Sequence, residues 1–206
     1  MMIRSVSPAR RGWVRVETDR GDWLLASRDV DRLGLAVGSN VDATDLRRTA
    51  MDAQLPAARK DTGRYLARSE HTRQQLRRYL KRRGYVSKAV EDTLEWAVRL
   101  GYVDDLRFAR TFVASHRGGR SPMGRRRLQA ELRKRGVDGE DVRKALEDLD
   151  DGDLEDGLVA RVEKRYGGLE RRKAWRRAMG YLSRRGFSAG MARRVVERAL
   201  GDGGGS

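Results

Sequence analysis

The 206-residue chain has no cysteine, only two histidines and three prolines, and no long hydrophobic run. Without cysteine there is no disulfide, thiolate nucleophile or Cys-based zinc site, and His71 and His116 are too few for a histidine-rich metal centre. No apolar segment approaches the roughly 20 residues that span a bilayer. Residues 1–4 do not lead into the apolar core of a signal peptide. We therefore expect a cytoplasmic protein with no membrane contact, no metal and no cofactor.

Acidic residues are scarce relative to basic ones. The sequence has 46 lysines and arginines against 30 aspartates and glutamates, a formal net charge of +16, and 39 of the bases are arginine. A GC-rich genome explains arginine in place of lysine, but it does not explain the excess of bases over acids. Such a surplus predicts a polyanionic partner, most commonly nucleic acid, with a merely solvated basic surface as the alternative.

Strand patterns occupy the N-terminal extension, residues 1–41. Residues 13–17 alternate apolar and polar side chains, a turn cluster follows at 18–22, and residues 23–26 form a second apolar run. This pattern predicts a β-hairpin, to which Ile3 to Val6 adds a third strand.

Two tryptophans and a short helix complete this extension. Trp13 and Trp23 could face a nucleic-acid base, but we expect them to cover the small sheet. A helix over about 29–33 is expected to stop at Gly34.

Residues 42–69 are expected to form a helical connector and the start of a first repeat. Asp42 is a suitable N-cap for the first helix. Pro56 lacks an amide hydrogen and clashes one turn back, so we predict a break near Leu55 and a second helix from about Ala57.

A six-residue phrase recurs three times at intervals of about 50 residues. It reads LKRRGY at 80–85, LRKRGV at 132–137 and LSRRGF at 182–187. Repetition at this period predicts a repeated supersecondary unit.

The first copy shows what the repeated unit is. Leu76, Tyr79 and Leu80 lie on one helical face, and Gly84 is placed to end that helix in the left-handed conformation. The expected caps of the following helices are Ser87, Asp138 and Ser188. A further helix is expected before each pair, at 105–117, at 154–166 and, in a shorter form, near 65–68. Ser121 and Pro122 are expected to open the middle helix of the second repeat.

These observations predict a mainly α fold, with three tandem three-helix repeats in an extended curved array preceded by a small three-stranded β extension. The expected repeats span residues 70–103, 104–152 and 153–200, followed by a disordered tail, 201–206.

The basic surplus is concentrated on the middle helix of each repeat, whereas the third helices carry both signs. A basic helix repeated along an array makes a stripe that suits a linear polyanion or a filament groove. The predicted DNA- or filament-binding residues are Arg73, Arg77, Arg78, Lys81, Arg82, Arg125, Arg126, Arg127, Arg133, Lys134, Arg172, Lys173, Arg176, Arg177 and Arg184.

The sequence offers little for catalysis, and we expect no enzyme activity. Adjacent carboxylates at Asp104 and Asp105 are typical of a helix start, and Glu70 beside His71 is typical of a helix end. There is no glycine-rich GxxxxGK[ST] phosphate loop.

Several of these residues resemble the RecX family of RecA regulators. The segment LGYVDDLRFA at 100–109 is similar to the family's junction between its first two repeats. Residues 65–72 with Leu76, and residues 127–137, are also similar, and the resemblance covers about 60–200. The third repeat departs from the pattern at Ala178, where leucine is usual, and at the Gly167-Gly168 pair.

The resemblance implies a non-enzymatic regulator in DNA repair, homologous recombination and the SOS response. Such proteins dock in the groove of the RecA–single-stranded DNA filament, promote its disassembly or block its growth, and so mostly inhibit RecA ATPase, strand exchange and coprotease activity. The implied partners are the RecA nucleoprotein filament and single-stranded DNA, with double-stranded DNA as a second candidate. We expect a monomer, with Tyr102 and Phe108 in the core.

Two alternatives remain open. One is a helix-turn-helix-like DNA-binding module or transcription regulator that acts independently of RecA. The other is a metal-dependent nuclease, which the carboxylate placement does not support. If the protein regulates RecA, as the resemblance implies, we expect charge reversal at Arg77, Arg78, Arg126 and Arg127 to abolish that regulation without unfolding the protein.

Overall fold

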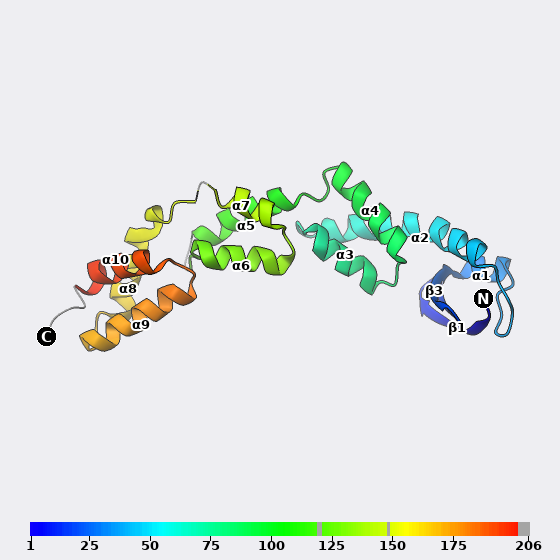
Figure 1. The fold of residues 1–206 in the computed structure, drawn as a ribbon, viewed down its shortest axis with the longest axis horizontal. Coiled ribbons are helices and arrows are strands. Elements are labelled where there is room, and N and C mark those ends of the chain that lie inside the picture. Colours follow the sequence, from blue (N-terminus) through cyan, green and yellow to red (C-terminus); the bar gives the residue numbers. More distant parts are fainter. Residues whose placement is uncertain (119–120, 148, 202–206) are drawn as a thin grey trace. The chain divides into compact units, whose positions relative to one another are not determined.

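The computed structural model describes residues 1–118, 121–147 and 149–201. It confirms a mainly α fold with an N-terminal three-stranded antiparallel sheet (Figure 1). The chain divides into two compact units, residues 1–104 and 105–206, which are described separately below. Apart from Gly201, the expected disordered tail lies outside the described residues.

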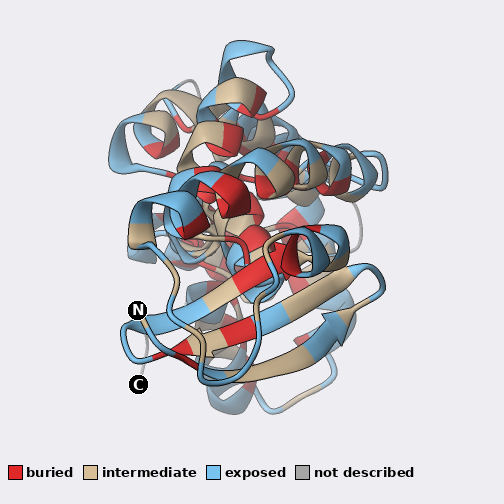
Figure 2. Ribbon diagram, turned by 90° about the vertical axis from the view of Figure 1, so that its right-hand side faces the viewer, coloured by how far each residue is buried: buried red, intermediate tan, exposed pale blue. Residues whose placement is uncertain are grey.

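The sheet of the first unit contains β1 (Ile3–Arg10), β2 (Trp13–Thr18) and β3 (Gly21–Ala26), so the predicted hairpin and third strand are both confirmed. Val16 lies opposite Val6 on one side and Trp23 on the other. Helix α1 (Ser27–Arg32) follows, and Gly34 takes a positive φ of 59° just beyond it. Buried residues alternate with less buried ones along the strands (Figure 2), and the core beside the sheet consists of Ile3, Val16, Leu25, Val30, Leu46 and Ala50.

The predicted break at Pro56 is wrong, because α2 runs without interruption from Ala43 to Leu66. Asp42 caps this helix as expected, accepting hydrogen bonds from the amides of Thr44 and Asp45. A proline inside a helix costs about 3 kcal/mol. Packing offsets that cost, because the part before Pro56 buries Leu46 and Ala50 against the sheet core and the part after it buries Ala58 in the first repeat.

The first repeat consists of the end of α2, then α3 (Arg73–Arg82) and α4 (Ser87–Arg99). The short helix expected near 65–68 is therefore the last turn of a long one. Gly84 has a φ of 83°, as the predicted helix stop requires. Leu76, Leu80, Tyr85, Val90, Leu94 and Ala97 are the main members of the core.

Ser87 is not the cap of α4, contrary to expectation. The N-cap is Val86, whose side chain offers no hydrogen-bond acceptor. The amide of Val86 instead donates to Oε1 of Gln54 at 2.7 Å, and Nε2 of Gln54 donates to the carbonyl of Leu24 at 2.6 Å. A buried glutamine thus joins the start of α4 to strand β3.

The second unit contains two further three-helix repeats. One consists of α5 (Asp105–Arg117), α6 (Arg125–Arg135) and α7 (Gly139–Ala145). The other has a 3-10 turn (Gly152–Leu154), then α8 (Glu155–Tyr166), α9 (Arg171–Arg184) and α10 (Ala189–Leu200). Asp138 and Ser188 cap α7 and α10 as predicted.

Helix α6 begins at Arg125 with Gly124 as its N-cap, so the predicted start at Ser121 and Pro122 is wrong. The Gly124 amide donates to the carbonyl of Arg185 at 2.9 Å, and the Arg126 amide donates to the carbonyl of Gly186 at 3.1 Å. The end of α9 therefore satisfies amides that every helix start leaves without an intrahelical partner. A Cβ on Gly124 would lie 2.6 Å from the Gly186 carbonyl carbon, so the two backbones touch.

Tyr102 does not lie in the core as expected, since 55% of its surface is exposed. After Gly101, which has a φ of 69°, the chain turns and Val103 takes the buried position. The Tyr102 ring lies edge-on to Trp96, with centroids 5.4 Å apart. Phe108 is half-buried against the core of the second repeat.

Candidate nucleic-acid interface

Helix α3 buries one face and presents cations on the other. Leu76 and Leu80 are fully buried. Residues three and four apart lie side by side on a helix, so Arg78, Lys81 and Arg82 share the outward face. All three are exposed, and none forms a hydrogen bond or ion pair with another described residue through its side chain. Arg73 is exposed in the first turn of the helix.

Arg77 belongs to the packing between helices rather than to this face. Its Nε and Nη2 donate to the two carboxylate oxygens of Glu91 at 2.9 and 2.8 Å, in the paired geometry that favours strong charge-assisted bonds. This hydrogen bonding lowers the pKa of Glu91 below its ordinary value. Arg77 therefore joins α3 to α4 and is poorly placed to meet a ligand.

Helix α6 repeats the arrangement. Leu128 and Leu132 are buried, while Arg126, Arg133 and Lys134 are exposed and have no side-chain partner in the described ranges.

Two other predicted contact residues of α6 have neighbours of their own. Arg125 is exposed, and its Nη1 reaches the carbonyl of Leu149 at 3.4 Å. Arg127 is half-buried, and its Nη1 donates to the carbonyl of Arg184 at 3.4 Å. Arg127 therefore lies in the junction between the second and third repeats.

Helix α9 has the longest basic face. Ala174, Ala178 and Leu182 are its buried residues. The Glu170 carboxylate accepts the backbone amides of residues 172 and 173 and so caps the helix. The predicted contact residues on this helix are all exposed, and they are Arg172, Lys173, Arg176, Arg177 and Arg184.

The base that directly precedes the helix-ending glycine has a structural role in each repeat. Arg83 lies 3.3 Å from the Asp61 carboxylate and donates from Nε to the Tyr79 hydroxyl at 3.0 Å. Arg135 pairs with Glu131 at 2.5 Å and stacks over the Phe112 ring at 4.5 Å.

Arg185 completes the pattern. It bonds to Ser121 and lies over the Tyr181 ring at 5.6 Å. One position earlier, Arg82, Lys134 and Arg184 are exposed. The shared phrase thus places one structural base beside one outward base.

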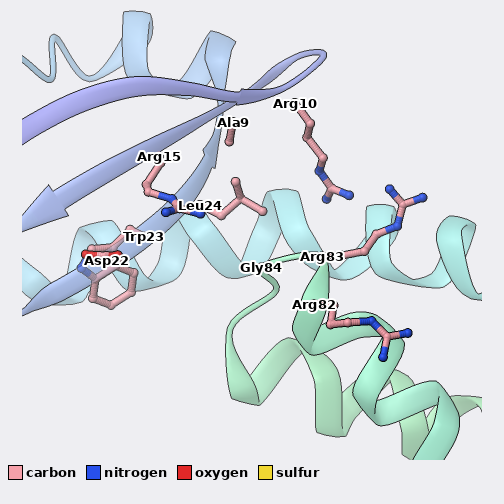
Figure 3. Close-up of a pocket in the computed structure, with 9 residues that line it drawn as sticks. All are labelled: Ala9, Arg10, Arg15, Asp22, Trp23, Leu24, Arg82, Arg83 and Gly84. Carbon is pink, nitrogen blue, oxygen red and sulfur yellow. The ribbon is translucent and has the colours of Figure 1, made fainter.

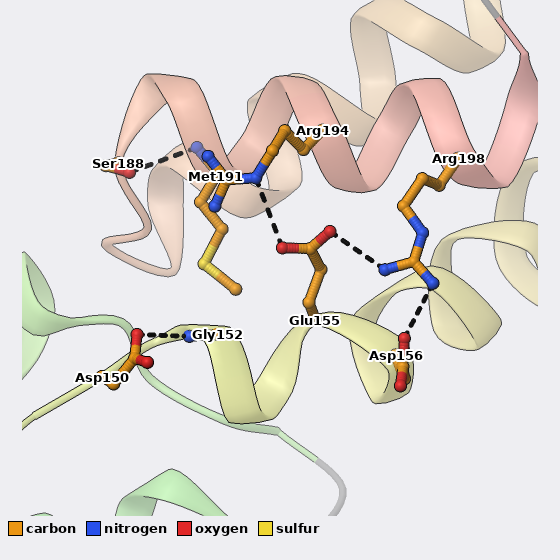
Figure 4. Close-up of polar contacts among 8 residues, drawn as sticks. All are labelled: Asp150, Gly152, Glu155, Asp156, Ser188, Met191, Arg194 and Arg198. Carbon is orange, nitrogen blue, oxygen red and sulfur yellow. Dashed lines mark hydrogen bonds and ion pairs between the residues drawn. The ribbon is translucent and has the colours of Figure 1, made fainter.

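Several charges of α8 and α10 are paired with one another. Figure 4 shows Glu155 of α8 between Arg194 and Arg198 of α10, with separations of 3.4 and 3.0 Å. Arg198 also contacts Asp156 at 2.8 Å. The hydrogen bond from Arg198 lowers the pKa of Glu155. The α8–α10 side is therefore close to charge balance, in contrast to the outward face of α9.

One feature of the first unit escaped the sequence analysis. Strands β1 and β2 bring Arg10 and Arg15 to the C-terminal end of α3, where Arg82 and Arg83 lie. The four arginines line a pocket of about 480 Å³ (Figure 3). No local sequence pattern predicts this pocket, because its residues on the strands and on α3 are about 70 positions apart in the sequence.

Within residues 1–118, 121–147 and 149–201, no three His, Cys, Asp or Glu side chains gather closely enough to hold a metal ion. Over the same ranges, no helix combines the length and apolar character needed to cross a membrane.

Comparison with known proteins gives three successive matches to one family. The first, second and third three-helix domains of RecX match residues 63–96, 104–146 and 155–196. The regulatory protein RecX of Thermobifida fusca is 40% identical over 140 residues, which cover 66% of this chain and 75% of the relative. The RecX of Streptomyces coelicolor is 39% identical over 140 residues, covering 66% and 74%.

A solved structure supports the same fold. The crystal structure of a regulatory protein RecX superimposes with a TM-score of 0.65 at 20% identity, over 94% of this chain and 98% of the other. At that identity the likeness shows the fold alone, while the closer sequence matches and the three domains show the family. The chain belongs to the RecX family of regulatory proteins.

Proposed function

We propose that this protein regulates the RecA recombinase by binding the RecA–single-stranded DNA filament through the basic faces of α3, α6 and α9. Binding in the filament groove would promote disassembly or block extension, and so inhibit ATP hydrolysis, strand exchange and coprotease activity. One observation carries the proposal. The middle helix of each repeat carries exposed bases, such as Arg78, Arg126 and Arg176, that have no side-chain partner among the described residues. In contrast, Arg194 and Arg198 of α10 form ion pairs with acids of α8.

Physical chemistry links this face to a linear polyanion. Each cation that neutralises a phosphate releases a condensed counterion, which makes binding steeply dependent on salt. Surface cations without ion pairs are already solvated and exposed, so no internal bond has to break when they meet a phosphate. Because the unit is repeated, such cations occur on three successive middle helices. Three similar basic surfaces suit a ligand that is itself a repeating filament.

The experiment is RecA ATP hydrolysis on single-stranded DNA, with RecA from the same organism and this protein added in substoichiometric amounts. We expect a marked fall in the rate, because a filament regulator acts on many subunits per molecule bound. Simple coating of DNA requires saturating amounts instead. An unchanged rate despite tight DNA binding would reject the proposal in favour of a DNA-binding module that acts independently of RecA.

The structure also sharpens the charge-reversal test. Arg77 and Arg127 are tied to Glu91 and to the Arg184 carbonyl, so reversing them would disturb packing. Reversal to glutamate at Arg78, Lys81, Arg126 and Arg133 avoids those contacts. The matched control reverses four exposed bases that lie off the middle helices and form no ion pair with a described residue, namely Arg4, Arg28, Arg99 and Arg110.

Both variants change the net charge equally. We expect the first to abolish the effect on RecA and the control to retain most of it. Equal losses in the two variants would mean that only net charge matters, and would refute binding by the middle-helix faces.

A further inference from the structure

A groove runs between the N-terminal sheet and the first repeat, wholly within the first unit. One part is the pocket of about 480 Å³ lined by Arg10, Arg15, Trp23 and the Arg82–Gly84 segment (Figure 3). A second pocket of about 480 Å³ shares Asp22, Trp23 and Gly84 with the first, and adds Arg47 and Lys88 among its lining residues. Trp23 packs against the sheet core, as the sequence analysis expected, and also contributes to the lining of both pockets.

Positive charge exceeds negative charge in this groove. The first pocket is lined by four arginines and a single carboxylate, that of Asp22. Asp61 also contacts two of these arginines, Arg10 at 3.2 Å and Arg83 at 3.3 Å. Arg15 and Arg82 are exposed and form no ion pair with any described residue. The site therefore retains a net positive charge that an anion would neutralise.

Some donors in the wall of the groove are held inside the protein. Nε and Nη2 of Arg10 and Nε1 of Trp23 are buried and have no hydrogen-bond acceptor among the described residues. The guanidinium of Arg10 lies over the rings of Trp13 and Tyr85, at 5.0 and 4.7 Å from their centroids. The protein therefore fixes Arg10 in place, and the exposed cations that remain for a ligand are Arg15 and Arg82.

The tryptophan narrows the class of anion. Single-stranded nucleic acid alternates phosphates with flat bases, and proteins that bind it combine cationic grooves with aromatic rings on which bases stack. A duplex keeps its bases inside the helix and offers none to a ring in a groove. An acidic peptide would neutralise the arginines, but its acidic side chains have no flat ring to stack on the indole of Trp23. Single-stranded nucleic acid therefore fits the groove best.

We propose that this groove binds a short stretch of single-stranded nucleic acid, with a base stacked on Trp23 and the flanking phosphates held by Arg15 and Arg82. The proposal deepens the proposed function, on which it rests, because Arg82 belongs both to the groove and to the outward face of α3. In this proposal the N-terminal sheet binds the nucleic acid directly, through Arg15 and Trp23. The single-stranded nucleic acid would then extend from α3 onto the sheet.

The first test measures whether a base of the nucleic acid stacks on Trp23. The full chain is titrated into a labelled oligothymidylate of about 15 nucleotides and into a matched abasic oligomer. Stacking contributes about 1–3 kcal/mol per base, so the wild type is expected to prefer the oligothymidylate by about 5-fold or more. Trp23→Leu should lose most of that preference, while the control Trp96→Leu in α4, outside the groove, should keep it. The preference is a ratio of two affinities, so a partly unfolded variant does not alter it.

The second test measures the phosphate contacts on variants that leave the core untouched. For single strands, the log–log dependence of affinity on salt weakens by about 0.7 for each phosphate contact removed. The double variant Arg15→Gln, Arg82→Gln should therefore lower the slope by about 1.4, which is twice that amount. Arg4→Gln, an exposed arginine of β1 outside the groove, should leave the slope unchanged.

The outcomes separate the groove from the proposed function. Full retention of base preference by Trp23→Leu, an unchanged slope in the arginine variant, or no oligonucleotide binding by the wild type would each overturn the groove. If the wild type still suppressed RecA ATPase in those cases, the proposed function would stand without it. If the groove behaved as expected but RecA ATPase never changed, the groove would stand and the proposed function would fall.

Discussion

The hydroxyl of Tyr85 donates a 2.8 Å hydrogen bond to the carboxylate of Asp61, in the buried space between α2 and the start of α4. Arg10 at 3.2 Å, Arg83 at 3.3 Å and Arg64 at 3.8 Å surround the same carboxylate. One acid thus ties strand β1, helix α2 and the turn after α3 together. The sheet and the first repeat form a single unit in part because of this cluster.

Asp61→Asn is expected to destabilise the first unit. Removing one partner of a buried ion pair costs about 3–5 kcal/mol. Here the arginines can relax toward water, because 38% of the Arg83 side chain and 67% of the Arg64 side chain are already exposed, so we expect about 2 kcal/mol. Urea unfolding followed by tryptophan fluorescence measures the change. Asp52→Asn, an exposed acid on the same helix, is the control and should change stability little.

Alkaline pH should release the same contact. Burial, aided by the hydrogen bond to Asp61, raises the pKa of Tyr85 from 10.0 to about 12. A raised pKa in the folded state means that the neutral form contributes stability that is present below pH 10 and is lost as the pH rises toward 12. The wild type should therefore lose stability over this window, and Tyr85→Phe should lose less of it. Tyrosinate absorbance and unfolding at each pH check the expectation, and equal losses would contradict it.

Acid should weaken the contact between α3 and α4. The hydrogen bond from Arg77 lowers the pKa of Glu91, so the folded state favours the ionised acid. That contribution is present above the ordinary pKa of 4.5 and is lost as the pH falls through the lowered value. Because 40% of the Glu91 side chain is exposed, we expect Glu91→Gln to cost under about 1 kcal/mol near neutral pH.

The measurement is the difference in unfolding free energy between wild type and Glu91→Gln as the pH is lowered. The difference should shrink in acid, because the wild type then protonates Glu91. Glu95→Gln, an exposed acid on the same helix, is the control and should show no such convergence. A difference that stays constant down to low pH would contradict the expectation.

Gly124→Ala should loosen the second and third repeats from one another. The new methyl group would lie 2.6 Å from the Gly186 backbone, closer than real Cβ contacts. Overpacking of this kind costs about 1–3 kcal/mol. Gly157→Ala in α8 is the control, since nothing lies within 4 Å of its Cβ, and it should stabilise by about 0.5–1 kcal/mol. Thermal unfolding of both variants measures the effect, and equal melting temperatures would contradict the role of this junction.

Local patterns predicted most of the fold because the deciding interactions are local. The alternation in β2, the glycines with positive φ, and the caps Asp138 and Ser188 depend on residues a few positions apart. The mistakes occur where distant residues decide. Gln54 replaces a local cap for α4, and packing at both ends carries α2 through Pro56.

The candidate site was predictable by helix but not by residue. Composition and repetition identified α3, α6 and α9 as the basic helices. Whether a given arginine faces water depends on contacts across the fold, such as Arg77 with Glu91 and Arg127 with the Arg184 carbonyl. The groove at Trp23 needs the strands and α3 to meet, and no single segment of sequence contains that information.

Of the two bases before each helix-ending glycine, we expect the first to contribute to DNA binding and the second to contribute to the stability of the fold. A triple substitution to glutamine at Arg82, Lys134 and Arg184 removes three exposed cations and no ion pair within the described ranges. We expect an unchanged melting temperature and a salt dependence of single-stranded DNA binding that is shallower by about 2, at roughly 0.7 per contact.

A triple substitution to glutamine at Arg83, Arg135 and Arg185 removes bonds to Asp61, Glu131 and Ser121 and the stacking on three aromatic rings. This second variant has the same net charge, so any difference between the two reflects position alone. It should melt at a lower temperature while keeping the salt slope of the wild type at temperatures where it is folded. If both variants lost binding equally and melted alike, the bases would act only through total charge, and the division of roles within the repeated phrase would be wrong.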